Sequence, residues 1–343
     1  MSRVHHQPQP AADAAVAAVV QRCLDAGASQ VDVAVEFAGA RSWIRIAAAG
    51  AVDLAPPETA SHVHPSPAAL DGLDLVGAGL ALGSSVTVAS TSRGAAGRRV
   101  LHWRLDGDGA ATPVEAMQEP APLDDAEVAA AATVVLVEGL HEVLAYKRRE
   151  GRVIEAVVER LCARLVEALG LAFHRAVAGT QRRRAPLAIT VNAVEVTPRD
   201  PFAAELPPLR LRRRELPFVA GGGVQAVTAT PYVLAPFDAD PATGRQGFFV
   251  YLRDRLVQAG GWSRLNVAGR SDGLARIAVD LPAAATGAFA WEAPARRVLF
   301  PASLVPALRA LAFEAVTAVS AQPASPTGEM STCGLAQKGT SMV

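Results

Sequence analysis

The sequence of 343 residues predicts an α+β fold in two regions, and three observations carry this prediction. Apolar residues make up 50% of the chain but aromatic residues only 5%, so the cores must consist mainly of Val, Leu and Ile. Segments that alternate apolar and polar residues, as strands do, are interspersed with segments of helical spacing. A short basic segment, 179–186, then separates the first region from a β-rich second region.

The first region begins with a helix and a strand hairpin. An Ala- and Val-rich stretch predicts a helix over 13–26, which Gly27 ends. Period-two alternation predicts strands over Ser29–Ala38 and Ser42–Gly50, with a tight turn between them. Later in the region, we expect strands at Val86–Ser90, Arg98–Leu105 and Thr133–Val137, with loops at 51–70 and 106–122.

Further elements are predicted at the end of the first region and throughout the second. Apolar residues at helical spacing predict a long helix over Arg152–Ala178. We expect Leu187–Val196 to open the second region as a new strand segment. The remaining elements are strands at Val224–Phe237, Gln246–Gln258 and Leu274–Pro282, a closing helix at Pro301–Val316, and polar tails at 1–12 and 319–343 that we expect to be disordered.

Composition excludes several classes of protein. The 33 basic and 33 acidic residues cancel, so no net charge draws the chain to nucleic acid or to anionic lipid. Cys23, Cys162 and Cys333 lie far apart without a CxxC pair, which argues against a disulfide scaffold or a zinc site. No apolar run is long enough to span a bilayer, and the N-terminus lacks a secretory signal pattern. We therefore expect a cytoplasmic protein that does not span a membrane.

Several short motifs occur in an order that resembles a known superfamily. They are LDAGASQVDVAV at 24–35, IRIAAAG at 44–50, GAGL at 77–80 as a Gly-rich turn, and TVVLV at 133–137. This order is similar to the ATP-binding domain of the GHKL superfamily, which includes gyrase B, heat-shock chaperones, histidine kinases and MutL. The resemblance implies a degenerate GHKL ATPase-like domain over 13–180, with a Bergerat-type α/β sandwich.

Motifs in the second region strengthen the resemblance. They are VNAVEVTPRDPF at 191–202, TPYVLAPF at 230–237, LARIAVDLP at 274–282 and, most specifically, FVYLRDRLVQAGGW at 249–262. These motifs are similar to the transducer region of bacterial MORC/MutL-like proteins. The resemblance therefore implies a transducer-like α+β domain over 186–318.

The catalytic positions of the family are substituted in this chain. The family's first helix carries a Glu that acts as general base and, four residues later, an Asn that binds Mg²⁺. Ala18 and Arg22 stand at these two positions. Ala cannot accept a proton and Arg carries only donors, so the resemblance implies neither a catalytic base nor a Mg²⁺ site. Arg22 is a candidate to pair with a phosphate directly, against the alternative that it binds nothing.

Four further positions are candidates for binding a nucleotide. Ala48 replaces the Asp that contacts adenine in the family, whereas Gly50 of the same motif is retained. Gly77 and Gly79 match the family's Gly-rich phosphate loop, and Thr133 matches a Thr on a late strand. The alternatives stay open: the glycines are simple turn residues, and Thr133 reflects β-propensity alone.

Together these substitutions imply a catalytically degenerate GHKL-type ATPase homologue, which acts as a binding or structural subunit in a DNA-associated bacterial complex. The competing hypothesis is an active but atypical ATPase of the MORC/MutL-like type. No cofactor is assigned; ATP stays open and Mg²⁺ is not expected. We expect a protein partner or a homodimer. The candidate DNA contacts, whose alternative is a solvated linker and loop, are Arg182, Arg183, Arg184, Arg210, Arg212, Arg213 and Arg214.

Overall fold

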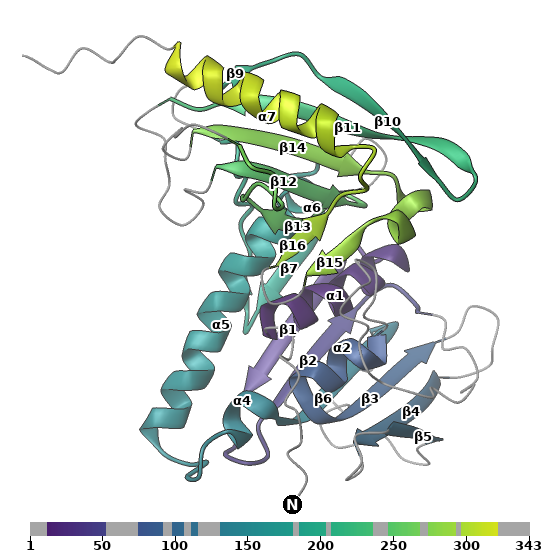
Figure 1. The fold of residues 1–343 in the computed structure, drawn as a ribbon. Coiled ribbons are helices and arrows are strands. Elements are labelled where there is room, and N and C mark those ends of the chain that lie inside the picture. The colour runs from purple at the N-terminus through teal and green to yellow at the C-terminus, as the bar shows by residue number, and fades with distance from the viewer. Residues whose placement is uncertain are drawn as a thin grey trace, which may run out of the picture.

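The chain folds as a mixed α+β protein with two main sheets, as predicted. A computed structural model describes residues 12–52, 75–91, 98–105, 111–115, 131–180, 185–203, 207–235, 246–267, 274–292 and 296–321. The two sheets lie one above the other, and a long helix runs along one side from the lower sheet to the upper (Figure 1). Most of both predicted tails and of the predicted loop 51–70 falls outside the described residues.

The first sheet has eight strands in the order β5-β4-β3-β6-β2-β1-β7-β8. Neighbouring strands pair antiparallel except for β1 and β7, which are parallel. The strands are β1 (Gln30–Glu36), β2 (Trp43–Ala48), β3 (Gly83–Thr91), β4 (Arg98–Leu105), β5 (Ala111–Glu115), β6 (Thr133–Leu140), β7 (Ala188–Val191) and β8 (Val194–Glu195). The predicted hairpin and the three predicted strands after it are confirmed.

Helices cover one face of the first sheet. They are α1 (Ala12–Asp25), α2 (Leu75–Leu82), α4 (His141–Leu144), α5 (Arg152–Ala172) and α6 (His174–Val177). Buried residues of α1, α2 and α5 join the inward side chains of the sheet in one apolar core, which is built largely from Val, Leu, Ile and Ala. The predicted helix over Arg152–Ala178 is present, but it breaks at Phe173, whose backbone leaves the helical region with φ of −111°.

Three sequence predictions for this region are wrong. Leu187–Val196 does not open the second sheet, because β7 pairs with β1 and extends the first sheet. The GAGL segment is not a turn; Gly77–Leu80 lies within helix α2. The predicted loop 106–122 contains strand β5, which pairs with β4 at the edge of the sheet.

The second sheet has the order β10-β11-β14-β12-β13, with β9 also paired to β11. Its strands are β9 (Leu209–Arg210), β10 (Arg214–Ala220), β11 (Gly223–Val233), β12 (Gly247–Leu252), β13 (Arg255–Ala259) and β14 (Ala275–Leu281). The predicted strand segment Gln246–Gln258 is therefore a hairpin, whose turn residues Arg253 and Asp254 have φ of +51° and +64°. A 3-10 helix, η2 (Ala283–Ala288), leads into the small pair β15 (Ala290–Glu292) and β16 (Arg297–Leu299).

The closing helix α7 (Val305–Ser320) lies across the outer face of the second sheet (Figure 1). It packs on β11 and β14 through a second apolar core. This confirms the predicted helix, although α7 starts later than Pro301 and reaches into the segment predicted as a disordered tail. None of the described helices is long and apolar enough to cross a membrane.

Arginine side chains join the first region to turns of the second. Arg253 Nη1 lies 3.0 Å from Asp25 Oδ2 of α1, and Arg255 Nη1 donates to the carbonyl oxygen of Ala17 at 3.3 Å. Arg296, in the turn between β15 and β16, pairs with Asp13 at 2.6 Å. Helix α1 is therefore held between the first sheet and two turns of the second region.

Candidate functional site

The retained Gly50 lies where the end of β2 meets the turn after α1. A Cβ atom at Gly50 would lie 2.7 Å from the backbone nitrogen of Ala28 and 3.1 Å from the carbonyl oxygen of Ala26. Both neighbours are backbone atoms that cannot rotate away. Glycine at this position thus has a packing reason, because it lets the chain after β2 approach the end of α1.

Thr133 and Gly50, which the resemblance places in one site, are in direct contact. Thr133 Oγ1 donates to the carbonyl oxygen of Gly50 at 2.8 Å and accepts the backbone N–H of Val52 at 2.9 Å. Ser90 Oγ lies 3.0 Å from Thr133 Oγ1 and donates to the carbonyl oxygen of Val52 at 2.6 Å. We call these two hydroxyls and the backbone of Gly50 and Val52 the hydroxyl centre.

The hydroxyl centre is closed. Both hydroxyl-bearing residues are buried, and Thr133 is fully so. Each hydroxyl has a single proton, and both protons are donated to backbone carbonyls of the segment after β2. The centre therefore fastens this segment to β3 and β6 and leaves no donor for a ligand.

Sequence analysis did not find Ser90. It lies directly across from Thr133 in the pairing of β3 with β6. The available signal was that each of these strands has a small hydroxyl residue at one end of its apolar run, but the register that brings the two together is not visible in either segment alone.

The substituted positions lie on the helix side of the same sheet. Ala18 of α1 and Ala48 of β2 are both buried in the core between the helices and the first sheet. Arg22 is partly buried, one helical turn after Ala18. The residues Ala18 and Ala48 supply neither a base nor an acceptor for an adenine amino group, so the carboxylate chemistry of the family is absent at these two positions.

The two candidate phosphate-loop glycines serve helix packing. Gly77 and Gly79 are buried in α2, which packs on α1 and β3. A Cβ at Gly79 would lie 2.6 Å from Val86 Cγ2, so glycine allows α2 to approach the sheet closely. Within the described part of the chain, no group of three His, Cys, Asp or Glu side chains is placed to hold a metal ion.

A second polar centre joins α6 to the second sheet. The buried His174 donates from Nδ1 to the carbonyl oxygen of Leu171 at 2.9 Å, and its Nε2 lies 3.4 Å from Tyr251 Oη. The Arg175 guanidinium stacks 3.4 Å from the centre of the Tyr251 ring and pairs with Asp280. Burial lowers the pKa of His174 and raises the pKa of Tyr251, so both side chains are held neutral. This centre binds the two regions together.

Other reactive side chains do not extend the site. Cys23 is buried in α1, and burial raises its pKa to about 12, so it carries no thiolate at neutral pH. Of the predicted DNA contacts, Arg182, Arg183 and Arg184 lie outside the described residues.

The remaining predicted DNA contacts are exposed but partly neutralised. Arg213 pairs with Glu215 at 2.9 Å, and Arg214 pairs with Glu314 of α7 at 3.0 Å. Arg210 lies over the Tyr232 ring. Two of these four arginines are thus paired with carboxylates at the surface.

Comparison with known proteins adds no family to this description. A scan against protein-family models found no match, and a search of curated proteins found none either.

Proposed function

We propose that this chain is a catalytically degenerate GHKL-type ATPase homologue that acts as a binding or structural subunit. The observation that carries the proposal is the closed hydroxyl centre. The Thr133 hydroxyl, which the resemblance assigns to a nucleotide site, is fully buried and donates to Gly50 of its own chain. A side chain whose donor is already used within the protein contributes little to binding a ligand.

Three features support a Bergerat-type origin for the first region. The antiparallel run β3-β6-β2-β1 carries α1 and α2 on one face, and the end of β2 meets the turn after α1. The positions compared with the family's motifs thus lie on neighbouring elements. In the proposal the chain keeps the fold but not the catalytic residues, since a fold can persist after the residues of its site are replaced.

The α1 contacts support a structural role. In the proposal, the ion pairs of Asp13 and Asp25 with Arg296 and Arg253 hold the helix that would carry catalytic groups in a fixed position. The residues at the two catalytic positions, Ala18 and Arg22, offer no base and no oxygen ligand for Mg²⁺. The chain then acts through its surface.

Equilibrium dialysis of the full chain against labelled ATP, with and without Mg²⁺, tests the proposal. We expect no saturable binding at millimolar ATP. A combined variant, Ala18→Glu with Arg22→Asn and Ala48→Asp, restores the family's side chains, and we expect any Mg²⁺-dependent affinity only there. Saturable binding of ATP to the unmodified chain would overturn the proposal in favour of an atypical ATPase.

A further inference from the structure

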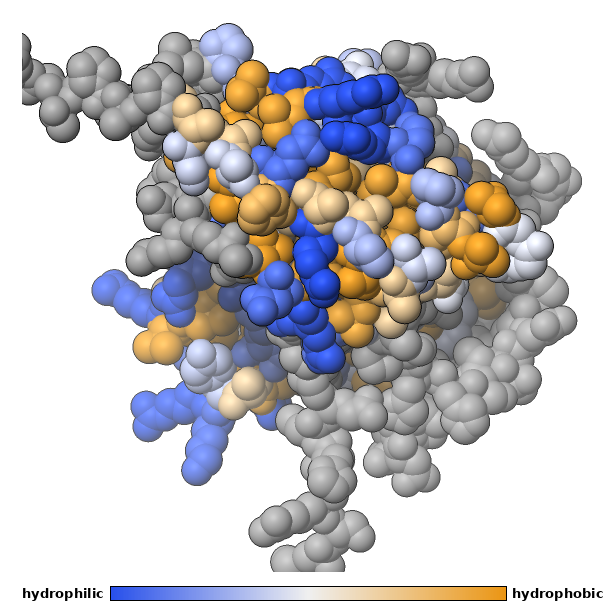
Figure 2. All heavy atoms as spheres, turned by 45° about the horizontal axis from the view of Figure 1, so that its top comes forward, coloured by the Kyte–Doolittle hydropathy of each residue, from blue (hydrophilic) through white to orange (hydrophobic). Residues whose placement is uncertain are grey.

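Helix α7 has a second, outward-facing stripe. Its inward residues, Leu308, Leu311, Ala312, Ala315 and Val316, are buried on the second sheet. Exposed residues recur on the other side at the spacing i, i+3, i+4 and i+7, namely Pro306, Arg309, Ala310 and Phe313. Figure 2 turns this face toward the viewer and shows apolar side chains gathered across it. Phe313 is 61% exposed and is the largest apolar residue of this stripe.

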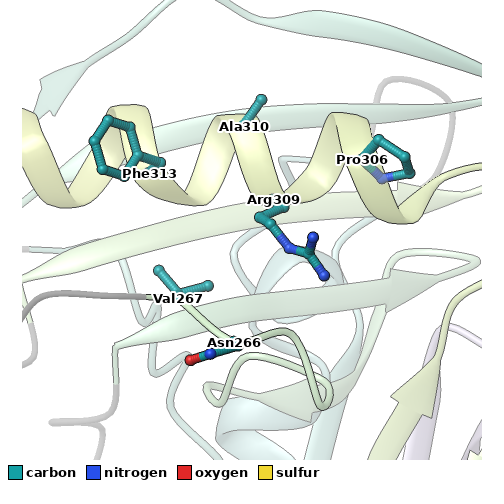
Figure 3. A pocket seen from close by; sticks show the side chains of 6 residues that line it. All are labelled: Asn266, Val267, Pro306, Arg309, Ala310 and Phe313. Atoms are coloured by element: carbon teal, nitrogen blue, oxygen red, sulfur yellow. The ribbon is translucent and has the colours of Figure 1, made fainter.

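This stripe forms one wall of a groove of about 440 Å³. The opposite wall is the loop after β13, which contributes Asn266 and Val267. Figure 3 shows Arg309 pointing from α7 across the groove and Phe313 further along the same helix. We call this feature the α7 groove.

Arg309 supplies the charge of the α7 groove, as far as the described residues that line it show. Within the described residues, Arg309 has no hydrogen bond or ion pair, whereas Glu314, the other charged residue of α7, pairs with Arg214 at 3.0 Å. Asn266 adds an amide that can donate a hydrogen bond. An apolar groove with a free guanidinium is complementary to an apolar segment that carries a carboxylate.

We propose that the α7 groove docks an amphipathic, acidic helix of a partner protein. The small Ala310 leaves room between Pro306 and Phe313 for an apolar side chain of the incoming helix, as in ridges-into-grooves packing. An Asp or Glu of the partner then pairs with Arg309. A second copy of this chain fits less well, because a twofold contact joins the same patch of both copies, and the described lining of this patch offers Arg309 no carboxylate.

The proposal rests on the proposed binding role, but it concerns a different part of the molecule. ATP binding would overturn the proposed function without changing what binds to α7. Absence of peptide binding would overturn the docking proposal for the α7 groove and would leave the result with ATP unchanged.

A random library of displayed 16-residue peptides, selected on the full chain, tests the proposal. We expect enriched peptides to combine apolar residues at helical spacing with Asp or Glu. Selection on Arg309→Glu is the matched control, and there the acidic positions should change to Lys or Arg. The proposal is overturned if no peptides are enriched, or if both chains select the same peptides.

Affinities of a selected peptide then assign the site. We expect Phe313→Ala to weaken binding at least about tenfold, as for a central aromatic anchor, and Arg309→Gln about fivefold, as for an exposed ion pair. The controls are Val153→Ala and Arg148→Gln, which change exposed residues around the start of α5 and should leave the affinity unchanged. The proposal is overturned if the two control variants weaken peptide binding as much as the groove variants do. It is also overturned if the unmodified chain sediments as a dimer and Phe313→Ala dissociates that dimer.

Discussion

The hydroxyl centre and the α7 groove use polar groups in opposite ways. In the hydroxyl centre, Thr133 and Ser90 are buried and donate to backbone carbonyls of their own chain. In the α7 groove, Arg309 is exposed beside the apolar Phe313 and has no hydrogen bond or ion pair among the described residues. The first arrangement stabilises the fold. The second leaves the Arg309 guanidinium and the Phe313 ring accessible to a partner.

This difference shows why a resemblance in motifs does not settle a function. The residues that match the family are those with a packing role, such as Gly50 against Ala28 and Gly79 against Val86. The positions to which the proposed resemblance assigns chemistry carry Ala18, Arg22 and Ala48. We therefore expect substitutions in the hydroxyl centre to alter stability and substitutions in the α7 groove to alter binding.

Among substitutions within the hydroxyl centre and the α7 groove, Thr133→Val has the largest expected effect on stability. Valine has nearly the same shape but leaves the Gly50 carbonyl and the Val52 N–H without their partner, which should lower the free energy of unfolding by about 3 kcal/mol. Urea denaturation measures this change. The control is Thr91→Val, because Thr91 is exposed and its hydroxyl bonds Ala132; a loss below about 1 kcal/mol is expected there. Equal losses in the two variants would show that the centre has no special role.

A smaller loss is expected for Gly50→Ala. The added methyl group would meet the backbone of Ala28 and Ala26, so the end of β2 has to shift, and we expect a loss of about 2 kcal/mol. Gly223→Ala is the control, since a Cβ at Gly223 has no neighbour within 4 Å. Thermal melts of both variants measure the difference, and an unchanged Gly50→Ala protein would contradict the close approach.

The polar centre at His174 predicts a dependence of stability on pH. Burial lowers the pKa of His174, so the folded chain excludes a proton that the unfolded chain binds below about pH 6.5. The free energy of unfolding should therefore fall as the pH is lowered from 6.5 toward the folded pKa, and His174→Gln should flatten this slope. His102 adds a slope of the same sign, because burial lowers its pKa too. Urea melts of His174→Gln and of His102→Gln separate the two contributions, and an unchanged slope in His174→Gln would refute the assignment.

The smallest effect on stability is expected in the α7 groove. Phe313→Ala should change the free energy of unfolding by no more than about 0.5 kcal/mol, because most of the side chain is already in water. Leu308→Ala, on the buried side of the same helix, should cost about 3 kcal/mol. Chemical denaturation compares the two, and similar losses would mean that Phe313 belongs to the core.

Local periodicity predicted most elements because each lies within one segment. The alternation at Ser29–Ala38 and the helical spacing after Arg152 both correspond to elements of the fold. The register of β7 could not be predicted, because its parallel partner β1 lies far away in the sequence. The GAGL segment misled the prediction, since glycine usually marks a turn, whereas Gly79 here allows a helix to pack against Val86.

The candidate site was only partly accessible from sequence. The resemblance named Gly50 and Thr133 separately as candidates for one nucleotide site, and the structure brings these two residues into contact. The resemblance could not show that the Thr133 hydroxyl donates to the Gly50 carbonyl and is also contacted by Val52 and Ser90, because these contacts exist only in the folded chain. The α7 groove was also missed, because its second wall comes from a loop that precedes the helix by about forty residues.

Steady-state release of phosphate from Mg·ATP by the purified full chain tests the central claim most directly. With Ala18 and Arg22 at the family's base and metal positions, and with the Thr133 hydroxyl closed onto Gly50, we expect the rate to equal that of buffer alone at every protein concentration. A rate that rises in proportion to the protein concentration, and that Arg22→Gln abolishes without unfolding the chain, would contradict the account and show that the site has kept an ATPase activity.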